Sequence, residues 1–154
     1  MQIRAGNRQD EAIIRTIVFQ ALQEHGIEAD LEGRDNDLRN VEHNYFWHNG
    51  LCLVAESDGQ VIGVLAGRQS PADESVLELS RLAVVGGARR RGAGRKLIAT
   101  MLFFARNMEY KKIVLAVPGL PENPADPEVL TRLGFVQDEA TKDWTYSLSK
   151  QTTN

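Results

Sequence analysis

The 154-residue sequence contains one cysteine, Cys52, and three histidines. A single cysteine cannot form an internal disulfide, and three scattered histidines without a second cysteine show no zinc-ligand spacing. We therefore expect neither a disulfide nor a metal site. Cys52 lies in the apolar run 51–54, which favours a buried small side chain over a nucleophile.

The sequence also lacks a long apolar run and a strong charge of one sign. Residues 1–11 hold no apolar signal segment, and no run reaches membrane-spanning length. A formal net charge of -3 and a pI of about 5.6 argue against general binding to nucleic acid. Because 42% of the residues are hydrophobic, we expect one globular domain over residues 1–150, with a frayed end at 151–154. From the missing signal segment and the acidic balance, we expect a cytoplasmic protein with no membrane or nucleic-acid partner.

Positive charge is concentrated at the centre of the chain. An apolar run ends at Val85, a glycine- and arginine-rich turn covers 86–94, and apolar residues then recur at helical spacing to Ala105. Five cations fall within eight residues, namely Arg89, Arg90, Arg91, Arg95 and Lys96. Because a strand, a glycine turn and a helix offer backbone N–H groups to an anion, we expect a phosphate site here.

Two common phosphate motifs do not fit this turn. A P-loop requires Lys and Ser/Thr after its second glycine, where this sequence has Ala93 and Gly94. A dinucleotide fingerprint requires a third glycine where Leu97 stands. The turn therefore belongs to another class of phosphate site.

The remaining chain predicts alternating strands and helices. Asn7 is expected to cap a helix reaching about residue 24 with a stop at Gly26, and Asp35 or Asn36 to cap a second through Phe46. Strands are expected at 2–5, 51–57, 60–68, 75–85, 112–117, 135–138 and 144–148, with a short helix at 126–133. Asp58-Gly59 predicts a hairpin turn, and the apolar run 113–117 predicts parallel pairing across a right-handed crossover.

The order of these elements and two motifs resemble the GNAT N-acetyltransferases. The six residues from Arg89 to Gly94 match the family's Gln/Arg-x-x-Gly-x-Gly/Ala signature, and Leu133-Gly134-Phe135 is similar to its Leu-Gly-Phe. The resemblance covers nearly the whole chain and implies an α/β (α+β) GNAT fold, a mixed central sheet flanked by helices. It also implies acetyl-CoA as co-substrate, and as acceptor a primary amine of a small molecule, an amino acid or a peptide.

The resemblance further implies which residues hold acetyl-CoA. The main chain from Arg89 to Gly94 would bind the pyrophosphate, and the arginine side chains would bond there or to the 3′-phosphate. The pantetheine would pair with the backbone near 82–84, in a gap between the two central strands. The residues implied are Leu82, Ala83, Val84, Arg89, Arg90, Arg91, Gly92, Ala93, Gly94, Arg95 and Asn123, the last standing where many members place an Asn on the cofactor.

Glu78 is the candidate general base. A protonated amine has no lone pair, so acyl transfer requires a base, directly or through water. Glu78 lies on the central strand in an apolar neighbourhood, six residues before Val84. A backbone N–H near Val84 would stabilise the oxyanion. The alternative is a surface-facing carboxylate paired with Arg81 or another cation.

Two features leave alternatives open. Many family members carry a Tyr as general acid four residues before the Gly of Leu-Gly-Phe, whereas this sequence has Leu130; Tyr110 and Tyr146 are the other donors considered. Because that acid is missing, a non-catalytic acyl-CoA-binding module is the alternative to an enzyme. A homodimer is a further possibility for the assembly. The aromatic stretch His43, Tyr45, Trp47 and His48 is either a satellite of the core or a wall of the acceptor pocket.

Overall fold

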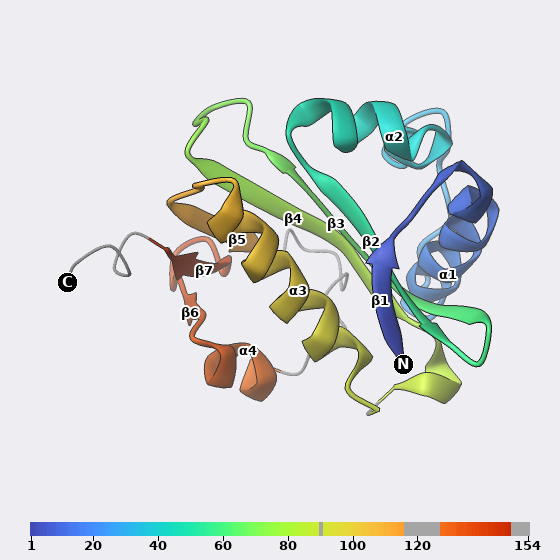
Figure 1. Ribbon diagram of the computed structural model, residues 1–154. Coiled ribbons are helices and arrows are strands. Elements are labelled where there is room, and N and C mark those ends of the chain that lie inside the picture. Colours follow the sequence, from blue (N-terminus) through green and yellow to red (C-terminus); the bar gives the residue numbers. More distant parts are fainter. Residues whose placement is uncertain (90, 116–126, 149–154) are drawn as a thin grey trace.

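The computed structural model describes residues 1–89, 91–115 and 127–148, which form one mixed sheet in the order β1-β2-β3-β4-β5-β7-β6 (Figure 1). Its strands are β1 Gln2–Ala5, β2 Leu51–Ser57, β3 Gln60–Gln69, β4 Val76–Val84, β5 Lys112–Leu115, β6 Val136–Gln137 and β7 Trp144–Ser147. Strands β4 and β5 pair in parallel, and the other neighbouring pairs are antiparallel. The predicted mixed sheet is confirmed.

Helices cover both faces of the sheet. On one face lie α1 (Glu11–Gln23) and α2 (Val41–Asn44), and on the other α3 (Ala93–Asn107) with α4 (Pro127–Leu133) beside it (Figure 1). Each face has its own apolar cluster. Ile14 and Val41 belong to the first, whereas Leu97 and Leu130 belong to the second. The sheet is therefore buried on both sides along its central strands.

The local signals at α1 and at the β2–β3 hairpin were predicted correctly. The Asn7 side chain accepts from the Gln9 N–H and Asp10 accepts from the Asn7 N–H, both at 2.8 Å, which is a capping box on the 3-10 turn Arg8–Asp10 that leads into α1. Gly26 follows the helix with φ of +73°. Asp58 and Gly59 both have positive φ, as a two-residue hairpin turn requires.

The second predicted helix is wrong as a continuous element. Residues 35–48 form three short pieces, the 3-10 turn Asn36–Arg39, α2, and the 3-10 turn Phe46–His48. Asn40 is extended at φ -151° and caps α2 by accepting from the His43 N–H, so it interrupts the helical path. The expected cap Asp35 makes no capping bond, because its carboxylate is used by Arg34 and Arg81.

A β-bulge distorts the middle of β4. Val64 on β3 faces Ala83, but Ala66 faces Ser80, so β4 holds one extra residue between these two pairs. Arg81 lies in this bulge with φ of +61°, a left-handed conformation that is uncommon for a residue with a side chain. A bulge bends its strand and raises the local twist, so β4 changes direction just before residues 82–84.

Candidate functional site

The glycine turn ends at an uncapped helix N-terminus. The 3-10 turn Gly86–Ala88 is followed by Gly92 at φ +87°, and no side chain in the described part of the sequence caps α3. The Lys96 N–H donates to the Gly92 carbonyl, so the N–H groups of the three residues before Lys96 precede the first helical bond. A Cβ added at Gly92 or Gly94 would meet nothing within 4 Å. A phosphate could therefore approach the backbone closely here.

One of the arginine side chains predicted to bind phosphate has partners within the protein. Arg89 donates through Nε to the Val84 carbonyl at 3.0 Å and forms an ion pair with Glu24 at the end of α1. Its side chain is thus committed to the protein, although its main chain lies in the turn. Arg91 donates to Ser57 Oγ at 3.3 Å, and Arg95 is exposed.

Two predicted cofactor residues lie outside the described part of the chain. These are Arg90 and Asn123. The three predicted pantetheine residues on β4 are described, and all are buried: Leu82 and Val84 face the cluster under α3, whereas Ala83 faces the opposite cluster. The described pairing of β4 with β5 ends at Leu79 and Leu115, and the β5 side of the expected gap between the central strands lies outside the described residues.

Glu78 is half-buried on β4, two residues before Ser80. It stands in register with Arg68 on β3 and with Val114 on β5. Within residues 1–89, 91–115 and 127–148, its carboxylate has no ion pair or hydrogen bond. The alternative pairing with Arg81 is wrong, because that guanidinium is held by two aspartates. Glu78 is therefore a carboxylate without a partner among the described residues, on the face of the sheet that carries α1 and α2.

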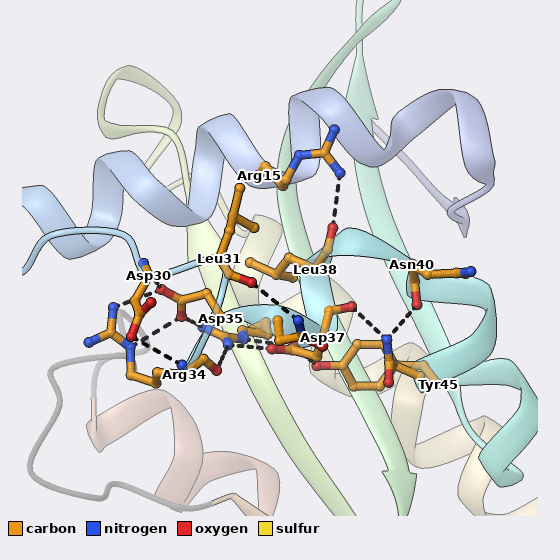
Figure 2. A network of polar contacts seen from close by, with 12 residues as sticks. Arg15, Asp30, Leu31, Arg34, Asp35, Asp37, Leu38, Asn40 and Tyr45 are labelled. Carbon is orange, nitrogen blue, oxygen red and sulfur yellow. Dashed lines mark hydrogen bonds and ion pairs between the residues drawn. The ribbon is translucent and has the colours of Figure 1, made fainter.

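A buried polar network lies between β4 and the loop before α2, and Figure 2 shows its members Arg34, Asp35, Asp37 and Tyr45. Arg81 on β4 is the centre of this network. Its guanidinium donates to Asp35 at 2.9 Å, to Asp37 at 2.6 Å and to the Arg34 carbonyl at 3.2 Å. Arg34 also bonds Asp35, and the hydroxyl of buried Tyr45 donates to Asp37. The network connects the bulge of β4 to residues 34–37, in the loop before α2.

The charges of this network are stabilised by their neighbours. Burial acts to raise the pKa of Asp35, but hydrogen bonds from Arg34, from the Asp30 N–H and from Arg81 lower that pKa overall. Burial acts to lower the pKa of Arg81, and Asp37 raises it overall. Burial and Asp37 together raise the pKa of Tyr45. Asp35, Arg81 and Tyr45 thus keep their ordinary charge states at neutral pH.

The lowered pKa of Asp35 predicts acid-sensitive stability. Because the folded pKa lies below the unfolded value of about 3.9, the contribution is full above that value and is lost as the pH falls through the folded pKa. We expect the free energy of unfolding, measured with urea from pH 7 to pH 3, to decline below about pH 4. Asp35→Asn should flatten this decline, and equal slopes in the two proteins would contradict the assignment.

No tyrosine occupies the place of a general acid in the described residues. Leu130 is fully buried in the cluster under α3, so a tyrosine there would need space that the core lacks. Tyr110 donates to the Asn49 carbonyl at 2.6 Å, and Tyr146 accepts from Arg106 in the last turn of α3. Both hydroxyls therefore lie toward the end of the sheet opposite the glycine turn.

The aromatic stretch contains both a core side chain and an exposed ring. Tyr45 is 3% exposed and belongs to the core, whereas Trp47 is 66% exposed and lies edge-on to His43 at 4.8 Å. Trp47 is therefore accessible to a ligand.

Cys52 is buried, and burial raises the pKa of its thiol to about 12, which fits a structural side chain.

Sequence reasoning missed two residues of this region. Arg81 was considered only as a partner for Glu78, and Arg68 was not considered at all. The consecutive polar pair Ser80-Arg81 within an apolar strand is the signal that could have indicated a bulge. Nothing in the sequence shows that Arg68 lies opposite Glu78, because that depends on register.

The described residues hold no group of three or more His, Cys, Asp or Glu side chains that could ligate a metal ion. Nor do those ranges contain a helix of the length and apolarity needed to cross a bilayer.

Comparisons with known proteins agree on one family. Residues 14–135 match the model described as the Acetyltransferase (GNAT) family. N-acetyltransferase 8F1 of Mus musculus is 34% identical over 90 residues, which cover 56% of this chain and 40% of that protein. N-acetylaspartate synthetase of Danio rerio is 31% identical over 110 residues, covering 71% of this chain and 38% of that protein. The chain matches about two fifths of the length of these relatives.

Solved structures show the same fold over nearly the whole chain. An acetyltransferase of the GNAT family from Staphylococcus aureus Mu50 superposes with a TM-score of 0.81 at 19% identity, over 96% of this chain and 98% of that one. A GNAT family acetyltransferase from Brucella melitensis, solved in complex with acetyl-CoA, gives 0.72 at 25% identity, over 96% and 87%.

Proposed function

Because the chain belongs to the acetyltransferase (GNAT) family, we propose that it transfers the acetyl group of acetyl-CoA to a primary amine of a small molecule, an amino acid or a peptide. The observation that carries this proposal is the N-terminus of α3, which offers backbone N–H groups beside Gly92 and Gly94 that no described residue caps. An anion at such a terminus gains both hydrogen bonds and the favourable end of the helix dipole.

The residues present fit CoA at this turn. The N–H groups of Ala93, Gly94 and Arg95 would hold the pyrophosphate, and the exposed cation Arg95 would add charge there or at the 3′-phosphate. The backbone of Leu82 to Val84, beyond the bulge, would hold the pantetheine arm. No metal is required for this chemistry.

Glu78 would act as the base. The amine nitrogen forms a bond to the thioester carbonyl carbon, the carbon–sulfur bond breaks, and the amine proton passes to the Glu78 carboxylate, directly or through water. A backbone N–H near Val84 would stabilise the oxyanion. The CoA sulfur leaves as a thiolate, which is tolerable because a thiol has a pKa of roughly 8.5. Catalysis therefore does not require a tyrosine at Leu130.

Gly94→Leu tests the coenzyme site. Gly94 lies in the first turn of α3 with ordinary helical backbone, so leucine is accepted and raises helix propensity. A helical side chain leans toward the N-terminus, so leucine would cover the free N–H groups. Losing one or two charge-assisted hydrogen bonds should weaken CoA binding, measured by calorimetry, roughly 100-fold.

Two controls make that experiment decisive. Gly94→Ala adds only a methyl group and should bind CoA much more tightly than the leucine variant. Pantetheine, which lacks every phosphate, should bind weakly to the unmodified protein and be insensitive to both changes. Equal affinities for pantetheine and CoA would refute the phosphate site.

A non-catalytic acyl-CoA-binding module is the second candidate function. It is favoured by the absence of a hydroxyl donor at Leu130 and by the engagement of Tyr110 and Tyr146 elsewhere. Thiol release from acetyl-CoA across a panel of amines separates the two. Tight acetyl-CoA binding with no release above the uncatalysed rate would favour the module.

A further inference from the structure

Arg68 and Glu78 form a pair of opposite charges in register across β3 and β4. Their Cα atoms are partners in the antiparallel ladder, so both side chains point to the same face of the sheet. This is the face on which Ala66 and Ala83 pack under α1 and α2. Arg68 is exposed and Glu78 is half-buried. The two residues therefore lie at the edge of the area that α1 and α2 cover.

Neither charge is satisfied by the described protein. Opposite charges directly across a strand pair usually attract, yet the two form no ion pair within 4.0 Å, and no other residue in the described ranges bonds either side chain. Other arginines of this protein are committed, such as Arg4 to Asp10 at 2.8 Å and Arg81 to its two aspartates. Arg68 and Glu78 therefore remain available to a ligand.

The surroundings leave this pair accessible. On the far side of Glu78, the next strand presents half-buried Val114, which carries no charge. On the far side of Arg68 stands Gly50, where a Cβ would lie 2.0 Å from the Gly67 carbonyl oxygen and 2.6 Å from the Arg68 Cα. Only glycine permits this approach, and it brings the turn that carries exposed Trp47 beside Arg68.

We propose that Arg68 and Glu78 form the acceptor subsite and that its acceptor is an α-amino acid, with the carboxylate on Arg68 and the amine at Glu78. This rests on the proposed function. Directly opposed residues have Cβ atoms about 4.5–5.5 Å apart. An α-amino acid carries its amine nitrogen and carboxylate oxygens roughly 3 Å apart, from standard bond lengths. The two groups of the ligand thus match the signs of the two charges and can lie between them, because the charged atoms of Arg68 and Glu78 form no ion pair within 4.0 Å.

The orientation also suits the reaction. Arginine binds a carboxylate through two parallel N–H bonds, which fixes the ligand's direction as well as its position. With the carboxylate held by Arg68, the amine faces Glu78 on β4, the strand that continues to residues 82–84. Arg68 does not touch the reacting atoms, so it is a positioning and specificity residue.

The test compares matched acceptors on matched variants. L-amino acids, their α-amides and the corresponding amines without a carboxyl group are offered with acetyl-CoA to the full chain and to Arg68→Gln. We expect kcat/KM to favour the free amino acid over its amide by about 10- to 100-fold, the value of a hydrogen bond between charged groups. Arg68→Gln should remove that preference, chiefly through KM, and Arg68→Lys should restore part of it.

A control variant and a binding measurement make each outcome decisive. Arg132→Gln, an exposed arginine on α4 across the sheet, should keep the preference. Calorimetry with CoA present should show amino-acid binding that Arg68→Gln weakens. Activity on amines with no carboxylate preference, or a preference that survives Arg68→Gln, overturns this inference and leaves the proposed function intact. Absence of thiol release with every acceptor overturns both.

Discussion

Glu78→Gln should lower kcat/KM for acetyl transfer by about 10²- to 10⁴-fold at neutral pH, the usual contribution of a positioned base. Glutamine keeps the shape of the side chain but cannot accept the amine proton. Binding of acetyl-CoA should hardly change, because Glu78 lies before the bulge of β4 and away from the glycine turn. The measurement is steady-state kinetics from pH 5 to pH 9, and the acidic limb that a carboxylate base produces should disappear in the variant.

Glu56→Gln is the matched control. Glu56 is also a half-buried strand glutamate, but it lies on β2 within 3.6 Å of Arg4. The same chemical change there should leave kcat/KM and its pH profile as they are. A pH profile for Glu78→Gln that coincides with that of the unmodified protein would show that another group takes the proton.

Arg81→Met should destabilise the protein by about 3–5 kcal/mol, the usual effect of removing one partner from a buried ion pair. Methionine fills similar space but leaves Asp35, which is 0% exposed, with only Arg34 to balance its charge. Asp37 keeps the Tyr45 hydroxyl but loses its cation. Urea unfolding at pH 7 measures the change as a shift in midpoint at constant slope.

Two further variants separate the network from ordinary surface charge. Arg39→Met breaks the exposed ion pair with Glu32 and should cost less than about 1 kcal/mol. Adding Asp35→Asn to Arg81→Met removes the orphaned buried charge, so the double variant should recover part of the loss. If Arg81→Met and Arg39→Met shifted the midpoint equally, the buried network would not be a source of stability.

The elements with local signals were predictable from the sequence. The Asp58-Gly59 turn, the Asn7 cap and the glycine turn each depend on the conformation of a few consecutive residues, and all three lie where expected. The helix predicted through Phe46 failed because extended Asn40 interrupts it, while its expected cap Asp35 bonds Arg81, 46 positions along the chain. Tertiary charge pairing decided that segment, and local propensity could not show it.

The candidate site was predictable to the same extent. Glycine spacing locates the turn, but the Arg89 side chain pairs with Glu24 directly after α1, a contact that only the folded chain defines. Glu78 could be selected by its strand and its chemistry. Its neighbour Arg68 could not, because a shift of one residue in strand register would place that side chain on the opposite face.

The bulge makes the number of residues in β4 as important as their identity. Leu77 and Leu79, at odd positions, face the cluster under α3, whereas beyond the bulge the even positions Leu82 and Val84 face it. Ser80 and Arg81 fall consecutively on the other side. A strand one residue shorter, without Arg81, would satisfy both apolar faces in unbroken alternation. The core therefore does not need this residue. The extra residue in β4 bends the strand and supplies the charge that binds the strand to the loop before α2.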